Sequence, residues 1–266
     1  MEIPIRNIYY ILSYAWKYFK FNDIASIDKK DFQTTTEFFG DLFDLSFTRY
    51  IKKGLQRDYV SYNEELKTIK SKIDFGTTLK KVGFKSKRFH CIYDDYTTNN
   101  LTNQIIKSTA FLLIKSKITQ EQKKSIKKKL IFLSGIENIQ ITKKTFKQLK
   151  RSRDNYNLNF LLNICIYIIS NSGFQQDEGT YSLSDFTNEN SMSAIFEKFI
   201  LNFYKKNLKD YKVKGSEHIK WDSETDNSLY PLMKTDITIR KPKMTYIIDT
   251  KYYKDMFQYN FNTPKF

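Results

Sequence analysis

Residues 230–254 read YPLMKTDITIRKPKMTYIIDTKYYK, and this stretch decides the fold of the C-terminal part of the chain. Residues 236–240 alternate between polar and apolar side chains, residues 241–244 contain Pro242, and residues 245–249 form a second, largely apolar run. Two such runs separated by a short turn predict a β-hairpin. We therefore expect residues 236–240 to pair antiparallel with residues 245–249, within a mixed sheet flanked by a helix.

The length of the turn sets the register of this hairpin. If Arg240 pairs with Thr245, then Asp236 stands opposite Asp249, and the Cβ atoms of directly opposed residues lie about 4.5–5.5 Å apart on one face of a sheet. Lys251 follows two residues after Asp249 and projects from the same face. The sequence thus predicts that two carboxylates and one ammonium group converge at one edge of the sheet.

Two opposed carboxylates repel each other unless a cation compensates them. Proteins hold Mg²⁺ through one or two carboxylates together with water and phosphate oxygens, and the backbone carbonyl of Thr250 could complete such a shell. Lys251 could then orient or deprotonate an attacking water, as a metal-dependent phosphodiesterase requires. The residues alone leave a second interpretation open, namely two solvated aspartates at strand ends with a neutralising lysine. The D-x-K spelling decides nothing by itself, since residues 28–30 and 210–212 match it too.

The charge of the chain is strongly positive and unevenly distributed. The formal net charge is +16. Residues 1–175 hold 31 basic and 16 acidic side chains, whereas residues 176–266 hold 14 and 13. A surplus of this size indicates a polyanionic partner, most often nucleic acid. A lysine-rich composition without functional meaning is the alternative.

Cysteine usage and hydropathy predict a soluble cytoplasmic protein that does not contact a membrane. Cys91 and Cys165 lie far apart and are expected to be free thiols in a reducing compartment. Two Cys and two His at these spacings exclude a zinc site. The most apolar run, residues 160–169, is about half as long as a membrane span of ~20 residues, and the start MEIPIRNIYY has no signal-peptide pattern.

Hydrophobic periodicity divides the chain into two regions of an α+β fold. The N-terminal region, residues 1–175, is predicted to be mainly helical with a small β part, and residues 176–266 form an α/β domain. The polar stretch 171–184 marks the boundary. We expect helices at residues 7–19, 37–56, 101–117, 120–133, 144–151, 155–170 and 191–208, and strands at residues 67–75, 88–93 and 212–221.

Several segments resemble the McrC family, the nuclease subunits of McrBC-type restriction systems for modified DNA. Residues 230–254 look like the catalytic hairpin of PD-(D/E)xK nucleases and of McrC in particular. Four further segments are similar to McrC in the same order along the chain, so the resemblance covers residues 3–266. These are IPIRNIYYILSYAWKYF (3–19), IKSKIDF (69–75), NNLTNQIIKSTAFLLIK (99–115) and SMSAIFEKFILNFYKKNL (191–208).

The resemblance implies a role for individual residues. Asp236 and Asp249 match the metal ligands for Mg²⁺, Lys251 matches the catalytic lysine, and Thr250 fills the variable position whose backbone faces the metal. Glu197 lies on the preceding predicted helix, where many nucleases of this fold keep an acidic residue near the metal. A solvated glutamate beside Lys198 is the alternative for that position. Thr235 replaces the proline that precedes the first aspartate in the family pattern.

The resemblance also implies partners. McrC-like proteins act with McrB, an AAA+ GTPase, and cut double-stranded DNA that carries modified cytosine. The N-terminal region is expected to dock on the GTPase or to line the DNA path, while the partner binds GTP, since this chain has no P-loop motif. McrC proteins continue beyond the position of Phe266, so we expect an incomplete nuclease domain that is inactive on its own.

Three other functions remain open from the sequence. The chain could be a non-catalytic basic adaptor that stimulates an AAA+ GTPase and carries an inactive nuclease fold. It could be an unrelated PD-(D/E)xK nuclease that acts alone, against which the McrC-like N-terminal half argues. It could also be a plain nucleic-acid-binding protein, for which the register of Asp236, Asp249 and Lys251 would be a coincidence.

Overall fold

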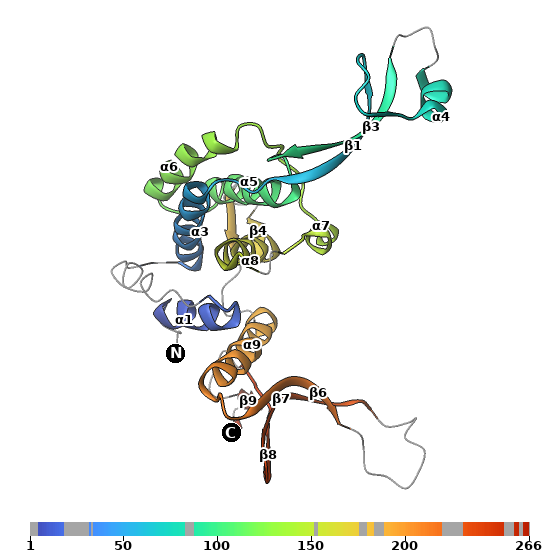
Figure 1. Cartoon of the computed structure of the whole chain (residues 1–266). Helices are drawn as coiled ribbons and strands as arrows, with labels where there is room; N and C mark the ends of the chain where they lie inside the picture. Colours follow the sequence, from blue (N-terminus) through green and yellow to red (C-terminus); the bar gives the residue numbers. More distant parts are fainter. Residues whose placement is uncertain are drawn as a thin grey trace.

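Aromatic side chains fill the centre of a helical body, which forms most of the N-terminal region (Figure 1). The computed structural model describes residues 5–18, 32, 34–82, 88–151, 154–175, 180–183, 189–219, 231–252, 258–260 and 263–265. Phe39, Phe43 and Phe47 repeat at helical spacing on one helix and are fully buried. The body comprises α3 (Thr35–Lys53), α5 (Leu101–Ile114), α6 (Gln120–Lys129) with the 3-10 turn η4 (Leu130–Leu133), α7 (Lys143–Gln148) and α8 (Tyr156–Asn171).

These helices confirm the prediction from periodicity, with ends that differ by a few residues. Local capping explains where several of them begin and end. The Thr34 side chain accepts a hydrogen bond from the Glu37 N–H and starts α3, and Gly54, with a φ of 93°, ends it. Thr119 and Gln122 form a reciprocal capping box at the start of α6.

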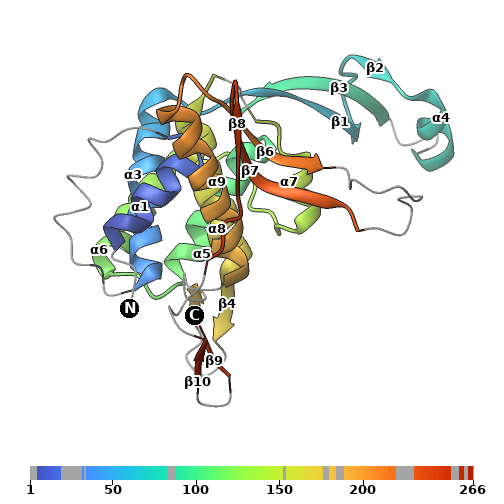
Figure 2. The same cartoon turned by 90° about the horizontal axis from the view of Figure 1, so that it is seen from below.

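A long antiparallel hairpin, which we call the arm (residues 58–82 and 88–97), projects from this body (Figures 1 and 2). It consists of β1 (Asp58–Leu66) and β3 (Phe89–Thr97), with Asp58 opposite Thr97 and Leu66 opposite Phe89. Its far end carries β2 (Lys72–Ile73), α4 (Phe75–Thr77) and the π-helical turn η2 (Thr78–Val82).

The arm corrects the sequence prediction in part. The strand predicted at residues 88–93 exists and is longer, but residues 67–75 form a strand only at Lys72–Ile73. The strand at residues 58–66 was not predicted, because its more sheltered face combines Asp58 with Val60 and Tyr62 while Tyr59 is exposed, so apolar side chains do not mark one face.

Buried amides fasten the base of the arm to the body. The backbone carbonyl of Gln56 accepts hydrogen bonds from the Nδ2 atoms of Asn100 and Asn103, each at 2.9 Å. Asn103 Nδ2 also donates to the Thr98 carbonyl at 2.7 Å, and its Oδ1 accepts from the Tyr50 hydroxyl at 2.5 Å. Burial raises the pKa of Tyr50 to about 12, so this hydroxyl remains a donor at neutral pH. The chain therefore enters and leaves the arm at fixed positions.

The C-terminal part is built on a three-stranded antiparallel sheet in the order β6-β7-β8. The helix predicted at residues 191–208 and the strand predicted at residues 212–221 are confirmed, whereas the mixed sheet is wrong for the described residues. The elements are α9 (Glu189–Asn207), β6 (Lys212–Ile219), β7 (Met233–Lys241) and β8 (Met244–Ile248). Residues 220 and 221 lie outside the described residues.

Two short hairpins complete the fold. The polar stretch at 171–184 is not simply a linker, because β4 (Ser172–Gln175) and β5 (Thr180–Leu183) pair within it. Near the C-terminus, β9 (Gln258–Asn260) pairs with β10 (Thr263–Lys265). Among the described residues, no helix is both long and apolar enough to cross a membrane.

The N-terminal helix α1 (Ile5–Ala15) joins the helical body to the C-terminal part (Figure 1). The predicted helix at 7–19 is confirmed, but it ends at Ala15 because Lys17 adopts a left-handed φ of 56°, and Phe19 lies outside the described residues. One core cluster includes residues of α1, α3, α5 and α8 together with Met192 and Ile195 of α9. The division at residue 175 stays a prediction for the sequence, while the packing is shared across it.

The side-chain amide of Asn202 links α9 to the end of α1. The Nδ2 atom of the buried Asn202 donates to the backbone carbonyls of Tyr14 at 3.0 Å and Ala15 at 3.3 Å. Around it, the Tyr14 ring packs against Phe199 and Phe203, with centroids 5.8 and 5.5 Å away. The last carbonyls of a helix lack partners within the helix, so Asn202 supplies one from an element about 190 residues away in the sequence.

Replacing Asn202 by Ala should lower the free energy of unfolding by about 1–3 kcal/mol, because buried carbonyls lose a donor. Urea denaturation measures this change. Asn207→Ala is the matched control, since Asn207 is exposed on the same helix and donates to the Phe203 carbonyl within α9 itself. Equal midpoints for both variants would show that the contact between α1 and α9 does not depend on Asn202.

Candidate active site

The β7–β8 hairpin has the register predicted from the sequence. Arg240 pairs with Thr245 and Lys241 with Met244, so Pro242 and Lys243 form the turn. The ladder continues to the pair of Ile237 and Ile248. Asp236 and Asp249 are the next residues on the two strands, immediately beyond this last pair. The hairpin therefore delivers both aspartates to the same end of the sheet.

Thr250, the residue between Asp249 and Lys251, holds the Asp236 side chain in place. The Oδ2 atom of Asp236 accepts two hydrogen bonds from Thr250, one from the backbone N–H at 2.7 Å and one from the hydroxyl at 3.0 Å. Asp236 is half-buried between the buried residues Thr235 and Ile237. The structure thus brings Asp236 together with the segment 249–251, across 14 positions of sequence.

Asp249 and Lys251 lie on the solvent side of this arrangement. Lys251 Nζ lies 3.2 Å from Asp249 Oδ2, and their side chains are 62% and 68% exposed. This ion pair fits the chemistry of a D-x-K site, and it is also what a pair of solvated strand-end residues would form. Both charged groups are open to a polyanionic substrate. The assignment of Asp236, Asp249 and Lys251 as site residues stays a prediction.

Glu197 lies half-buried on α9. In the described part of the chain, no three His, Cys, Asp or Glu side chains form a group that could hold a metal ion. Glu197 is therefore not brought into one cluster with the two aspartates, and its role as a ligand stays a prediction.

The available donors at the hairpin suit a hard cation. They are two carboxylates and the backbone carbonyl of Thr250, and Mg²⁺ prefers oxygen ligands and retains several waters in such partial protein sites. One carboxylate oxygen of Asp236 is occupied by Thr250. Its other oxygen and the exposed carboxylate of Asp249 remain available to a cation.

The helix α9 supports the strand that carries Asp236. Gly215 of β6 lies opposite Ile237 of β7, and a Cβ atom on Gly215 would come within 2.6 Å of Leu201 Cδ2. The glycine therefore allows α9 to pack closely on the sheet at this position. Ile237 and Ile239 are buried. By contrast, β8 is exposed along most of its length, with Tyr246 44% and Ile247 58% exposed.

An ion cluster on the neighbouring strands was not predicted from the sequence. Arg240 Nη1 donates to Glu217 Oε1 at 2.9 Å and lies 2.7 Å from Oε2. Lys214 Nζ donates to the same Oε1 at 3.3 Å. The hydrogen bond from Arg240, followed by that from Lys214, lowers the pKa of Glu217 to about 2. Nothing in the spacing of these residues marks them in advance, because the pairing of β6 with β7 brings them together.

This cluster makes the stability of the sheet sensitive to acid. Because the pKa of Glu217 is lower in the folded state than its ordinary value of 4.5, the stabilisation is present above that value and is lost as the pH falls towards about 2. Glu217→Gln should flatten this part of the profile. Thermal unfolding of both proteins between pH 2 and 6 measures it, and parallel profiles would contradict the role of Glu217.

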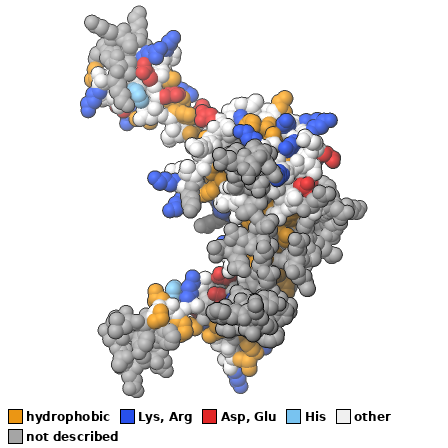
Figure 3. Space-filling model, turned by 180° about the vertical axis from the view of Figure 1, so that it is seen from behind, with side chains coloured by type: hydrophobic (Ala, Val, Ile, Leu, Met, Phe, Trp, Pro, Cys, Tyr) orange, Lys and Arg blue, Asp and Glu red, His pale blue; other side chains and the backbone are white. Residues whose placement is uncertain are grey.

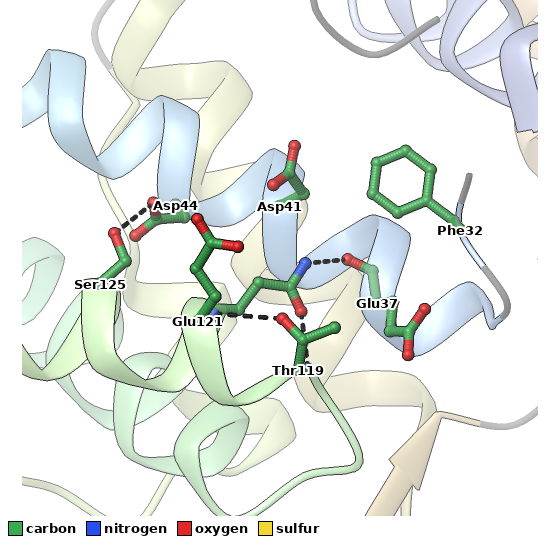
Figure 4. Close-up of a pocket in the computed structure, with 8 residues that line it drawn as sticks. Phe32, Glu37, Asp41, Asp44, Thr119, Glu121 and Ser125 are labelled. Carbon is green, nitrogen blue, oxygen red and sulfur yellow. Dashed lines mark hydrogen bonds between the residues drawn. The ribbon is translucent and has the colours of Figure 1, made fainter. Parts of the chain in front are cut away.

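A second concave site lies between α3 and α6, in the helical body (Figure 4). It is a cavity of about 370 Å³, and none of its lining residues comes from β6, β7 or β8. Ser125 Oγ and Lys129 Nζ donate to Asp44 at 2.8 and 2.6 Å. This cavity was not predicted from the sequence. It is lined by Phe32, Glu37, Asp41, Asp44, Thr119, Glu121, Gln122 and Ser125.

Comparison with known proteins agrees with the resemblance seen in the sequence. The family model described as "McrBC 5-methylcytosine restriction system component" matches residues 6–263. A relative from Escherichia coli strain K12, described as "Type IV methyl-directed restriction enzyme EcoKMcrBC", is 31% identical over 273 residues. That match covers 99% of this chain and 77% of the relative.

Two solved assemblies from Thermococcus gammatolerans share the fold. One contains McrB AAA+ hexamers with bound McrC, and a chain of it matches with a TM-score of 0.58 and 19% identity over 94% of this chain. A chain of an McrBC complex matches with a TM-score of 0.53 and 19% identity over 77% of this chain. This chain spans 56% and 59% of the length of the two matched chains.

The α+β architecture is therefore shared with those assemblies, and the family model and the Escherichia coli relative both extend across nearly the whole sequence. The chain belongs to the family of McrBC 5-methylcytosine restriction system components.

Proposed function

We propose that this chain is the endonuclease subunit of a GTP-dependent complex that restricts DNA containing modified cytosine. The observation that carries the proposal is the end of the β7–β8 hairpin, where Thr250 connects Asp236 to the D-x-K segment. The order of α9, β6, β7 and β8, with both aspartates at one end of a hairpin, supports a PD-(D/E)xK type of nuclease domain. The buried free thiols of Cys91 and Cys165 suit a cytoplasmic site of action.

Each residue of the site has a separate task in this mechanism. Asp236 and Asp249 would hold Mg²⁺ together with the Thr250 carbonyl, and Glu197 is a further candidate from α9. When bound, Mg²⁺ polarises the phosphodiester and lowers the pKa of a bound water. Lys251 orients that water and offsets the negative charge that develops on the phosphate. Its 62% exposure allows contact with the backbone of double-stranded DNA.

We further propose an AAA+ GTPase of the McrB kind as the partner. The structural relatives from Thermococcus gammatolerans include McrB AAA+ hexamers with bound McrC. In this chain, the two long strands of the arm contain five carboxylates and no Lys or Arg, although the whole chain carries a net charge of +16. The far end of the arm supplies the compensating basic residues, and Lys70 and Arg88 pair with Asp95 and Glu65. The long strands themselves are therefore poorly suited to DNA phosphates and better suited to a basic protein surface.

Exposed tyrosines on the arm add an apolar contact to this charge pattern. Tyr59 and Tyr96 face each other across β1 and β3, with ring centroids 5.0 Å apart. They are 77% and 53% exposed. Paired tyrosines that are accessible on a projecting element are typical anchors of protein–protein contacts. We assign docking on the GTPase to this arm.

The basic surplus of the body offers a contact for DNA. Lys127 and Lys128 follow Lys124 by three and four residues and are exposed with it on α6. These three lysines have no ion-pair partner among the residues that the structure describes. Lysine side chains on one helix face bind phosphates without reading the base sequence. Figure 3 shows how Lys and Arg side chains are distributed on one side of the molecule.

A second candidate function is that of a non-catalytic adaptor for the GTPase. The mutual ion pair of Asp249 and Lys251 favours it, because two mostly exposed side chains that neutralise each other need no metal. Both functions require the arm, so only the chemistry at the hairpin separates them.

One experiment separates these roles in the complex with the GTPase partner. Asp236→Asn, Asp249→Asn and Lys251→Ala should each reduce Mg²⁺-dependent DNA cleavage by at least about 100-fold, because each removes a group that stabilises transition-state charge. Stimulation of GTP hydrolysis should stay at the wild-type level. Cleavage by Asp249→Asn at the normal rate would refute the nuclease assignment and leave the adaptor.

The arm provides the complementary half of this experiment. Joint replacement of Tyr59 and Tyr96 by Ser should weaken partner binding by about 10-fold or more, as expected for interface anchors, and GTPase stimulation should fall with it. Tyr156→Ser is the matched control, since Tyr156 is 61% exposed on α8. If the control lowers stimulation as much as the arm variant does, the arm is not the docking element.

A further inference from the structure

The contact between Thr250 and Asp236 has a consequence for the proposed nuclease site. A single carboxylate oxygen, Oδ2 of Asp236, accepts both hydrogen bonds from one residue. In the described part of the chain, no other donor contacts Asp236. The remaining oxygen, Oδ1, is therefore the one that is free to meet a cation.

Two donors constrain an aspartate more than one does. The torsion between Cβ and the carboxylate of Asp is broad and roughly two-fold, so a single backbone N–H leaves the group free to swing about that contact. The hydroxyl of Thr250 supplies the second contact at 3.0 Å. Hydrogen bonds to an ionised carboxylate are also stronger than those between neutral groups.

The residue type at position 250 suits this task. Thr is β-branched, which restricts rotation about its Cα–Cβ bond, and Thr250 is half-buried at the end of the sheet. The direction of its hydroxyl is thus set by the restricted Cα–Cβ torsion. Asp249 and Lys251 are mostly exposed, so Thr250 is the member of the D-x-K segment that is fixed to the sheet.

We propose that Thr250 is a positioning residue of the metal site: its N–H and hydroxyl together fix the Asp236 carboxylate so that one oxygen faces the cation. The inference rests on the proposed function, and it gives the variable position of D-x-K a side-chain role in this chain. Ligand geometry must be held to within about 0.5 Å for a site to work, and the second contact supplies that restraint.

Binding of Mn²⁺ to the full chain, followed by electron paramagnetic resonance, tests this role without DNA cleavage. Thr250→Val keeps the shape and the backbone N–H but removes the hydroxyl. Its dissociation constant for Mn²⁺ should rise about 10–100-fold, as is usual when a partner of a metal ligand is lost. Thr250→Ser restores the hydroxyl and should stay within a few-fold of wild type. Thr245→Val, at an exposed position of the same hairpin, should bind as wild type does.

The outcomes distinguish this role from the function on which it rests. If Thr250→Val binds Mn²⁺ like wild type while Asp236→Asn and Asp249→Asn bind poorly, the positioning role is wrong and the metal site stands. If wild type binds no better than Asp236→Asn, both proposals are overturned. A general loss of folding would lower the urea midpoint of the metal-free Thr250→Val protein. In that case the Mn²⁺ affinities of Thr250→Ala and Thr250→Ser are compared instead. Equal affinity of those two variants would overturn the positioning role of the hydroxyl.

Discussion

The packing of α1 against α9 is the contact on which the position of the candidate site depends. Two successive residues of α9 contact different neighbours, one in α1 and the other in the sheet. Asn202 binds the last carbonyls of α1, which belongs to the core of the helical body. Leu201 fits against Gly215 of β6, the strand that pairs with β7 and hence with Asp236. The helix α9 therefore transmits the orientation of the body to the hairpin, and a shift at this joint would move the site relative to the arm.

Much of the fold was predictable because the decisive signals are local. Helices of the body repeat apolar residues at a regular spacing, and the turn at Pro242 fixes the register that brings Asp236 and Asp249 to one end of the sheet. The arm was only partly predictable, because the more sheltered face of β1 mixes acidic and apolar residues and so carries little hydrophobic alternation. Contacts between distant residues were not predictable either. The hydrogen bond from the Thr250 hydroxyl to Asp236 and the ion pair of Arg240 with Glu217 depend on how distant segments come together, which residue spacing does not show.

The proposed function gives this chain two partners of opposite charge, and the distribution of charge along the chain suits both of them. A net charge of +16 favours nucleic acid, yet the long strands of the arm carry only acidic charges. In Figures 1 and 2 the arm and the outer ends of β6 and β7 project from the same side of the body. A GTPase bound at the arm would therefore lie on the side towards which the β6-β7-β8 sheet extends, whereas the lysines of α6 remain on the body. Under the proposed function, this arrangement would couple GTP hydrolysis to the position of DNA.

The proposed mechanism requires a divalent cation at the end of the β7–β8 hairpin. The cavity between α3 and α6, lined by four carboxylates, provides the comparison region. Ferrous iron placed in the Mg²⁺ site, with ascorbate and peroxide, generates radicals that cut the polypeptide close to the metal. Mapping of the fragments by mass spectrometry is the most direct test. We expect cuts within residues 233–252 that disappear in Asp249→Asn. Cuts concentrated at residues 37–44 and 119–125, unchanged in that variant, would contradict it.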